Sequence, residues 1–255
     1  MNRKILFITL IFALSVVATS SAQMRAFGEC EDLDKKYAQA ISSNKTDTDF
    51  LQKALEEYSE SCMGSETHYK IAKSLQEQSP TYLSSLVCGF YTYNKIGRAK
   101  IALSYYEKAT ELTAEKDKRS NVLLTMAEIY ARDLKNFQQA RIYAEKSIAE
   151  NPQSIEAYSL LAELYAESTI SKDTVTDKAK YWLAFDMLQR AIEQAPESIC
   201  TEKLYFKSKE YIAHFPTKAE ISAHKDMRED KAYRIGGWIG RSTICRSMEN
   251  EIDKY

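Results

Sequence analysis

The sequence predicts an all-α fold built from antiparallel helix pairs, and two observations support this prediction. The 255 residues include only 7 glycines and 4 prolines, well below average usage of roughly 7% and 5%. A β-sandwich or barrel needs turn residues every ~8–12 positions, so an all-β fold is excluded. Apolar residues also recur at helical spacing along most of the chain. Residues 233–245 differ, because β-branched residues and glycines there predict a short strand or hairpin.

Residues 1–22 have the pattern of an export signal. Arg3 and Lys4 precede the apolar run Ile5 to Val17, and small residues favour cleavage after Ala22. The run is shorter than the ~20 residues of a membrane anchor, although an uncleaved anchor is the alternative. No cysteine follows directly to carry a lipid. We therefore expect a periplasmic or secreted protein without membrane insertion after signal removal. The net charge of −1 gives no basic surface for nucleic acid.

Residues 23–79 predict a helical hairpin and one extra helix, together a degenerate repeat. The hairpin begins with a helix over Glu29 to Ile41, and the extra helix covers about 65–78. In an antiparallel pair, the start of one helix meets the end of the next. Cys30 and Cys62 lie at such ends, so we predict a disulfide between them. Two buried free thiols are the alternative.

Residues 80–200 contain three self-similar helix pairs, of which the first, beginning near Pro80, is the weakest copy. In the other two, the first helix carries a bulky residue, then an apolar-small pair, then a tyrosine at fixed spacing. These residues are Leu123, Met126-Ala127 and Tyr130 in one copy, and Tyr158, Leu161-Ala162 and Tyr165 in the other. Each of these two copies ends in a proline, Pro152 or Pro196. One pair cannot bury its own apolar face, so neighbouring pairs must stack.

This spacing resembles the tetratricopeptide repeat (TPR). The resemblance implies a right-handed α-α superhelix, a solenoid in which small residues such as Ala127 and Ala162 let paired helices approach closely. The last copy departs from the pattern by about ten extra residues within Glu167 to Lys180. We expect a polar loop there, followed by a long second helix. Trp182 on that helix is expected to be a core residue.

Residues 201–255 predict a capping helix and a separate tail. Segments 181–191, 214–220 and 236–243 are similar to the carboxy-terminal part of a family of exported bacterial TPR proteins of uncharacterised function. That family commonly has a cysteine where this chain has Gly237, so any disulfide made by that cysteine is absent here. Cys200 and Cys245 are candidates to pair and staple the tail to the last repeat, whereas Cys88 is expected to be buried and free.

No motif for catalysis or metal binding stands out. The histidines, His68, His214 and His224, have no partner at metal-ligand spacing, and no nucleophile elbow is present. The glycines at 236–240 lack the lysine and the following helix of a phosphate-binding loop. We therefore expect no enzymatic activity, no metal and no cofactor.

Binding is the predicted function. The TPR resemblance implies that the first helix of each repeat lines a concave groove. The expected groove positions are Tyr91, Asn94, Lys95, Leu124, Glu128, Arg132, Ser159, Glu163 and Glu167. Only Asn94, Lys95 and Arg132 suit a peptide carboxylate, which disfavours the carboxylate clamp of chaperone-binding TPR domains. The three glutamates favour a basic or apolar peptide, and ordinary surface charges are the alternative.

The sequence therefore predicts a non-enzymatic exported scaffold that binds another protein or peptide of the cell envelope. Two alternatives are an enzyme or enzyme-accessory subunit with its site near Trp238 and Arg241, and a glycan- or peptidoglycan-binding module that uses exposed aromatic residues. Deletion of residues 217–255 is the simplest test between a tail site and a groove.

Overall fold

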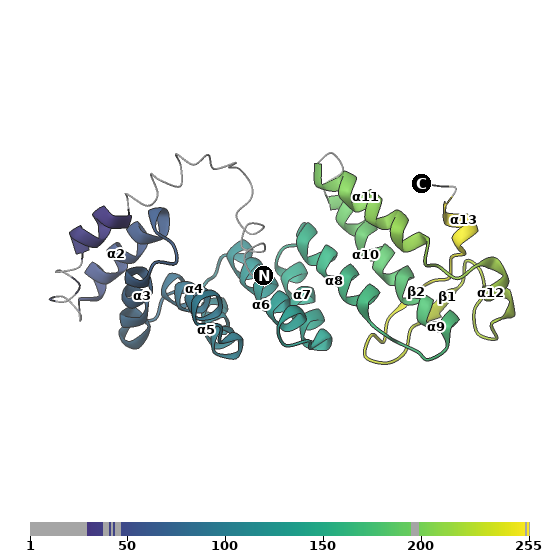
Figure 1. Cartoon of the computed structure of the whole chain (residues 1–255), viewed down its shortest axis with the longest axis horizontal. Coiled ribbons are helices and arrows are strands. Elements are labelled where there is room, and N and C mark those ends of the chain that lie inside the picture. The colour runs from purple at the N-terminus through teal and green to yellow at the C-terminus, as the bar shows by residue number, and fades with distance from the viewer. Residues whose placement is uncertain are drawn as a thin grey trace, which may run out of the picture. The chain divides into compact units, whose positions relative to one another are not determined.

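The computed structural model describes residues 30–37, 41, 43, 47–194, 199–252 and 254. The expected export signal lies outside these residues. The described chain is helical except for one short hairpin, which confirms the predicted fold class (Figure 1). It divides into two compact units, Met1–Lys95 and Ile96–Tyr255. Within the described residues, no helix is both long enough and apolar enough to cross a bilayer.

The first unit places residues 30–37 before three helices and a π-helical turn. These elements are α2 (Thr48–Ser61), α3 (Glu66–Gln78), α4 (Tyr82–Tyr91) and η2 (Thr92–Ile96), whose last residue belongs to the second unit. Each α-helix starts at a residue whose side chain accepts a hydrogen bond from the first turn: Asp47, Ser65 and Thr81. Such caps satisfy backbone N–H groups that a helix leaves free.

The predicted Cys30–Cys62 disulfide is present and ties residues 30–37 to the end of α2. The Tyr58 hydroxyl donates a 2.7 Å hydrogen bond to Asp34, which adds a second link between these segments. Cys88 on α4 is buried and free, as expected. Burial raises the pKa of its thiol to about 12, so this sulfur is a packing group rather than a reactive thiolate.

The second unit contains nine helices and two strands among its described residues. They are α5 (Ala99–Glu111), α6 (Lys116–Arg132), α7 (Phe137–Glu150), α8 (Ile155–Glu167), α9 (Thr174–Lys178), α10 (Lys180–Gln194), α11 (Ile199–Ile212), α12 (Lys218–Ala223), β1 (Ala232–Arg234), β2 (Ser242–Ile244) and α13 (Met248–Ile252). Helices α6 and α7 pack as one pair, and α8 and α10 as the next. These are the two stronger repeats of the sequence.

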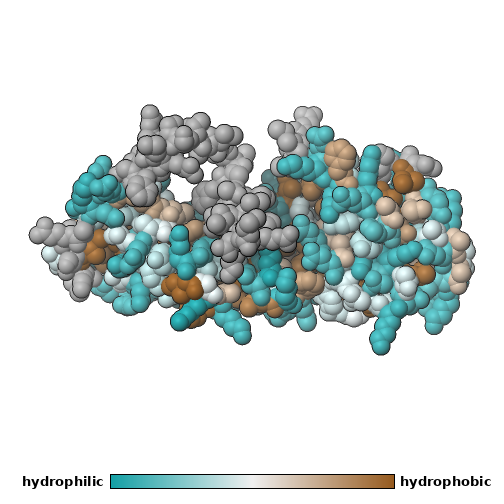
Figure 2. Space-filling model, viewed as in Figure 1, coloured by the Kyte–Doolittle hydropathy of each residue, from teal (hydrophilic) through white to brown (hydrophobic). Residues whose placement is uncertain are grey.

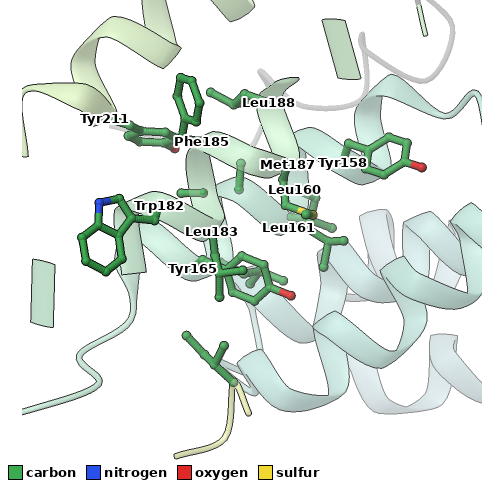
Figure 3. Packing of buried hydrophobic residues seen from close by; sticks show 14 of the residues in the cluster. Tyr158, Leu160, Leu161, Tyr165, Trp182, Leu183, Phe185, Met187, Leu188 and Tyr211 are labelled. Carbon is green, nitrogen blue, oxygen red and sulfur yellow. The ribbon is translucent and has the colours of Figure 1, made fainter. Parts of the chain in front are cut away.

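Small residues lie where the paired helices meet. Ala127, Ala140, Ala162 and Ala184 have no exposed surface. In the α8–α10 pair, leucine and aromatic side chains of the two helices interleave around these close contacts (Figure 3). Trp182 is fully buried, which confirms its predicted place in the core.

The expected polar loop between α8 and α10 is only partly a loop, because it contains the short helix α9. Asp173 caps α9, and Asp177 accepts hydrogen bonds from the backbone of Ile170 and Ser171. Lys178 on α9 pairs with Glu220 on α12 at 2.6 Å. The insertion therefore supports the tail.

The predicted tail hairpin is confirmed, with β1 antiparallel to β2 and Tyr233 opposite Thr243. The predicted Cys200–Cys245 bond is absent, because Cys245 is a free, buried thiol. The tail is attached near Trp182 at the start of α10, whereas α11, which carries Cys200, begins beyond the far end of that helix. A rise of 1.5 Å per residue puts Trp182 roughly 18 Å from Gln194 at the far end of α10, whereas the Cα atoms of a disulfide lie within about 7 Å of each other.

His68 provides a test of packing in the first unit. Its side chain is fully buried. Nδ1 accepts a hydrogen bond from the Gly64 backbone and Nε2 lies 2.9 Å from the Ser59 hydroxyl. Since the Ser59 hydroxyl donates to the Leu55 carbonyl, it accepts from Nε2–H, and His68 is neutral. Desolvation lowers its pKa from 6.5 to about 4.

We expect the first unit to lose stability as the pH falls from 6.5 to 4. The unfolded chain binds a proton on His68 in this range and the folded chain does not, so stability is complete only above pH 6.5. The loss attributable to His68 is about 3 kcal/mol at the acid end. Denaturant unfolding at pH 7 and pH 4.5 measures it. His68→Gln should flatten this pH dependence, and an equal dependence in both chains would contradict the assignment.

Candidate functional site

Three of the nine predicted groove residues lie in the first unit. Tyr91 ends α4 and stacks on Tyr69, with ring centroids 4.3 Å apart. Asn94 lies in η2, where its side chain donates to the Phe90 carbonyl at 2.9 Å. Lys95 is exposed. Asn94 is thus partly committed to its own helix, and Lys95 is the one of the three with a solvent-facing charge.

The other six residues lie on α6 and α8 in equivalent positions, because the two helices are offset by 35 residues. Leu124 corresponds to Ser159, Glu128 to Glu163, and Arg132 to Glu167. Leu124 is nearly buried, at 8% exposure. The remaining side chains are half-buried or exposed. We call this set of six positions, with their equivalents on α11, the first-helix face.

Sequence reasoning missed the α11 part of this face. Leu204, Ser208 and Tyr211 repeat the spacing of Tyr158, Ala162 and Tyr165. Ser208 stands in for the small residue, is fully buried, and accepts a hydrogen bond from Gln189 of α10. The sequence contains this spacing, although on its own it predicts only a capping helix.

The offset of 46 residues between α8 and α11 adds two positions to the first-helix face. Tyr205 is equivalent to Ser159, and Lys209 to Glu163. Tyr205 is 43% exposed, and Lys209 also faces solvent. The face therefore combines carboxylates on α6 and α8 with an aromatic ring and a cation on α11.

Electrostatic coupling indicates that these helices bring their charges together. Glu128 pairs with Arg132 at 3.7 Å and is 27% exposed. Desolvation raises the pKa of Glu128, and Glu163 and Glu156 raise it further while Arg132 opposes them. The pKa of Glu163 is raised first by desolvation and then by Glu167. Glu163 still reaches solvent, so water screens part of this effect.

On the face shown in Figure 2, the described hydrophobic residues form only scattered small areas. Large continuous apolar patches are a usual mark of docking surfaces, so charge is the more informative property here. The carboxylates of Glu156 and Glu163 raise the pKa of Glu128, and that of Glu167 raises the pKa of Glu163. They create a region of negative potential that attracts cations.

The tail residues named as an alternative site make structural contacts. The Trp238 ring lies near Phe137 and Tyr165, and the Arg141 guanidinium stacks over it at 5.6 Å. Arg241 pairs with Glu145 at 2.6 Å. Both side chains therefore hold the tail against α7 and α8.

The histidines do not form a site with acidic or sulfur ligands. His214 stacks on Tyr181, and His224 lies 3.2 Å from the Thr176 hydroxyl. Across the part of the chain that the structure describes, no three His, Cys, Asp or Glu side chains are grouped to hold a metal ion.

Two solved structures share the fold. The crystal structure of MamA covers 71% of this chain and 98% of its own, with a TM-score of 0.53 and 15% identity. YrrB, a TPR protein with an unusual peptide-binding site, covers 73% and 88%, with a TM-score of 0.51 and 17% identity. The chain has the TPR fold. No family model and no curated protein sequence matches it.

Replacing Arg132 should change the pKa of two carboxylates on this TPR face. We expect Arg132→Gln to raise the pKa of Glu128 and of Glu163, because the guanidinium stabilises both ionised forms. Carboxyl-carbon NMR titration measures the two values separately. Lys207→Gln is the matched control, because Lys207 lowers the pKa of Glu163 but is not among the groups that affect Glu128. An unchanged Glu128 pKa in Arg132→Gln would refute the coupling.

Proposed function

We propose that this chain is a non-enzymatic, exported scaffold that binds a basic segment of another cell-envelope protein or peptide. The binding surface is the first-helix face of α6, α8 and α11. The observation that carries the proposal is the concentration of Glu128, Glu163 and Glu167 on that face, where core packing does not require them. Tyr91, Asn94 and Lys95, which lie in the first unit, stay predicted binding residues of that unit.

Charge complementarity selects the class of partner. An arginine or lysine side chain of the partner would pair with the carboxylates and relieve their mutual repulsion. Apolar neighbours of that residue would pack on Tyr205. Arg132 and Lys209 interrupt the acidic surface, so the partner should carry separated basic residues rather than a continuous basic run.

The proposed location outside the cytoplasm has two supports. Residues 1–22 have the composition of an export signal. The Cys30–Cys62 disulfide suits an oxidising compartment, because cytosolic thiols are kept reduced.

We propose no activity for the tail. Trp238 and Arg241 are engaged in packing and ion pairing, and no observation favours a reaction beside them. Deleting residues 217–255 would also expose Trp182 to solvent. We therefore expect it to unfold the last repeat, so it would not test a tail site. Point substitutions are the better tools.

Photocrosslinking in intact cells tests the proposed face. A benzoylphenylalanine at Ser159 should capture an envelope protein, whereas the same group at Ala149, exposed on α7, should not. Equal capture from both positions, or capture from Ala149 alone, would contradict binding through the first-helix face.

Reversing the acidic charges should weaken capture. We expect the combined change Glu128→Lys, Glu163→Lys and Glu167→Lys to reduce it about tenfold, since exposed ion pairs contribute ~0.2–1 kcal/mol each. The matched control reverses three exposed glutamates elsewhere, Glu60, Glu111 and Glu193, and gives the same net charge. Undiminished capture by the first variant, or an equal loss in both, would exclude a basic partner segment on this face.

A further inference from the structure

We propose that residues 232–246, called the brace, fix how the α6–α7 pair packs against the α8–α10 pair, and thereby set the shape of the first-helix face. The biological meaning of this inference rests on the proposed function. Its structural claim does not, because the arrangement of the helices can be measured without a partner.

The brace is bonded to two charged side chains of α7. The Arg141 side chain is 16% exposed, and its Nη1 donates to the Trp238 carbonyl at 3.0 Å and also to the Ile239 carbonyl. Glu145, one turn later on α7, pairs with Arg241 at 2.6 Å. These bonds span nearly a hundred residues of sequence, and a half-buried guanidinium is costly to leave without acceptors.

The same segment is also bonded to α10, the second helix of the next pair. The Trp182 indole donates to the Arg246 carbonyl at 2.8 Å. Asp186, one turn later, accepts from the Thr243 hydroxyl at 2.7 Å and pairs with Arg246 at 2.8 Å. Helices α7 and α10 belong to successive repeats, so one short segment is bonded to both.

Trp238 adds an apolar wedge at this junction. Its ring centroid lies 6.4 Å from that of Phe137 on α7 and 6.2 Å from that of Tyr165 on α8. Gly237 and Gly240 on either side have positive φ angles of 62° and 55°, which glycine adopts without strain. The turn they permit places the ring between the two repeats.

A brace of this kind changes the mechanics of a repeat array. In such arrays each repeat contacts only its neighbours, and small rotations between repeats set the curvature of the binding surface. Here the interface of α7 with α8 is supplemented by a second connection through the tail. None of the described contacts of residues 232–246 involves the nine predicted groove residues, so the brace can shape the first-helix face without covering it.

Distances between spin labels test the brace directly. Asn121→Cys on α6 and Glu202→Cys on α11, both exposed, carry the labels in a parent chain whose Cys88, Cys200 and Cys245 are replaced by alanine. The Cys30–Cys62 disulfide is kept. Double electron–electron resonance then reports one distance distribution for the parent and one for Arg141→Ala combined with Trp238→Ala.

We expect a narrow distribution in the parent and a broader one, shifted to a different mean distance, in the double variant. Arg234→Ala, an exposed residue of the same hairpin, should match the parent. Circular dichroism confirms that each chain is folded, and if the double variant is not, Asp186→Asn replaces it with the same expected broadening. An unchanged distribution in a folded variant whose tail amides exchange faster would overturn the proposal, whatever the outcome of partner capture.

Discussion

The close approach of α8 and α10 is the contact on which the rest of the second unit depends. Ala162 and Ala184 have no exposed surface, and their small side chains let the larger residues beside them interdigitate. An extra methylene or two at such a place forces side chains off their preferred rotamers, which costs typically 1–3 kcal/mol. The pair still leaves apolar faces uncovered. These faces require a neighbour on each side, which dictates both the stacking of repeats and the need to end the array.

The tail ends the array in place of a helix. Helix α11 has the spacing of a first helix, and the usual next element would be its partner. Pro216 follows instead, and Ile212 and Phe215, each no more than 1% exposed, are buried in the same core as the tail. Burying such side chains contributes ~1.5–3 kcal/mol each. The insertion that carries α9 also contacts the tail, because Lys178 on α9 pairs with Glu220 on α12.

The sequence allowed the repeats, the Cys30–Cys62 bond, the buried Trp182 and the tail hairpin to be predicted, because each follows from local spacing or from the geometry of antiparallel helices. The prediction of a Cys200–Cys245 bond was wrong, because no local sequence pattern shows at which end of α10 the tail attaches. Helix α9 was missed because four of its five residues are polar and Val175 alone gives no helical pattern, whereas Asp177 and contacts with the tail and core stabilise it. The charged positions on α6 and α8 could be predicted from the repeat spacing. Lys209 on α11 could not, because the insertion between α8 and α10 changes the offset from 35 to 46 residues.

Native-state hydrogen exchange of the full chain tests most directly whether the tail and the repeats share one core. The backbone bonds between Lys231 and Cys245, and between Ile235 and Arg241, close the hairpin. If the tail is integral, these amides should be protected to the same free energy of opening as those in the middle of α8 and α10, because they open only when the unit unfolds. Exchange of the hairpin amides at much lower free energy, with α8 and α10 still protected, would contradict the account.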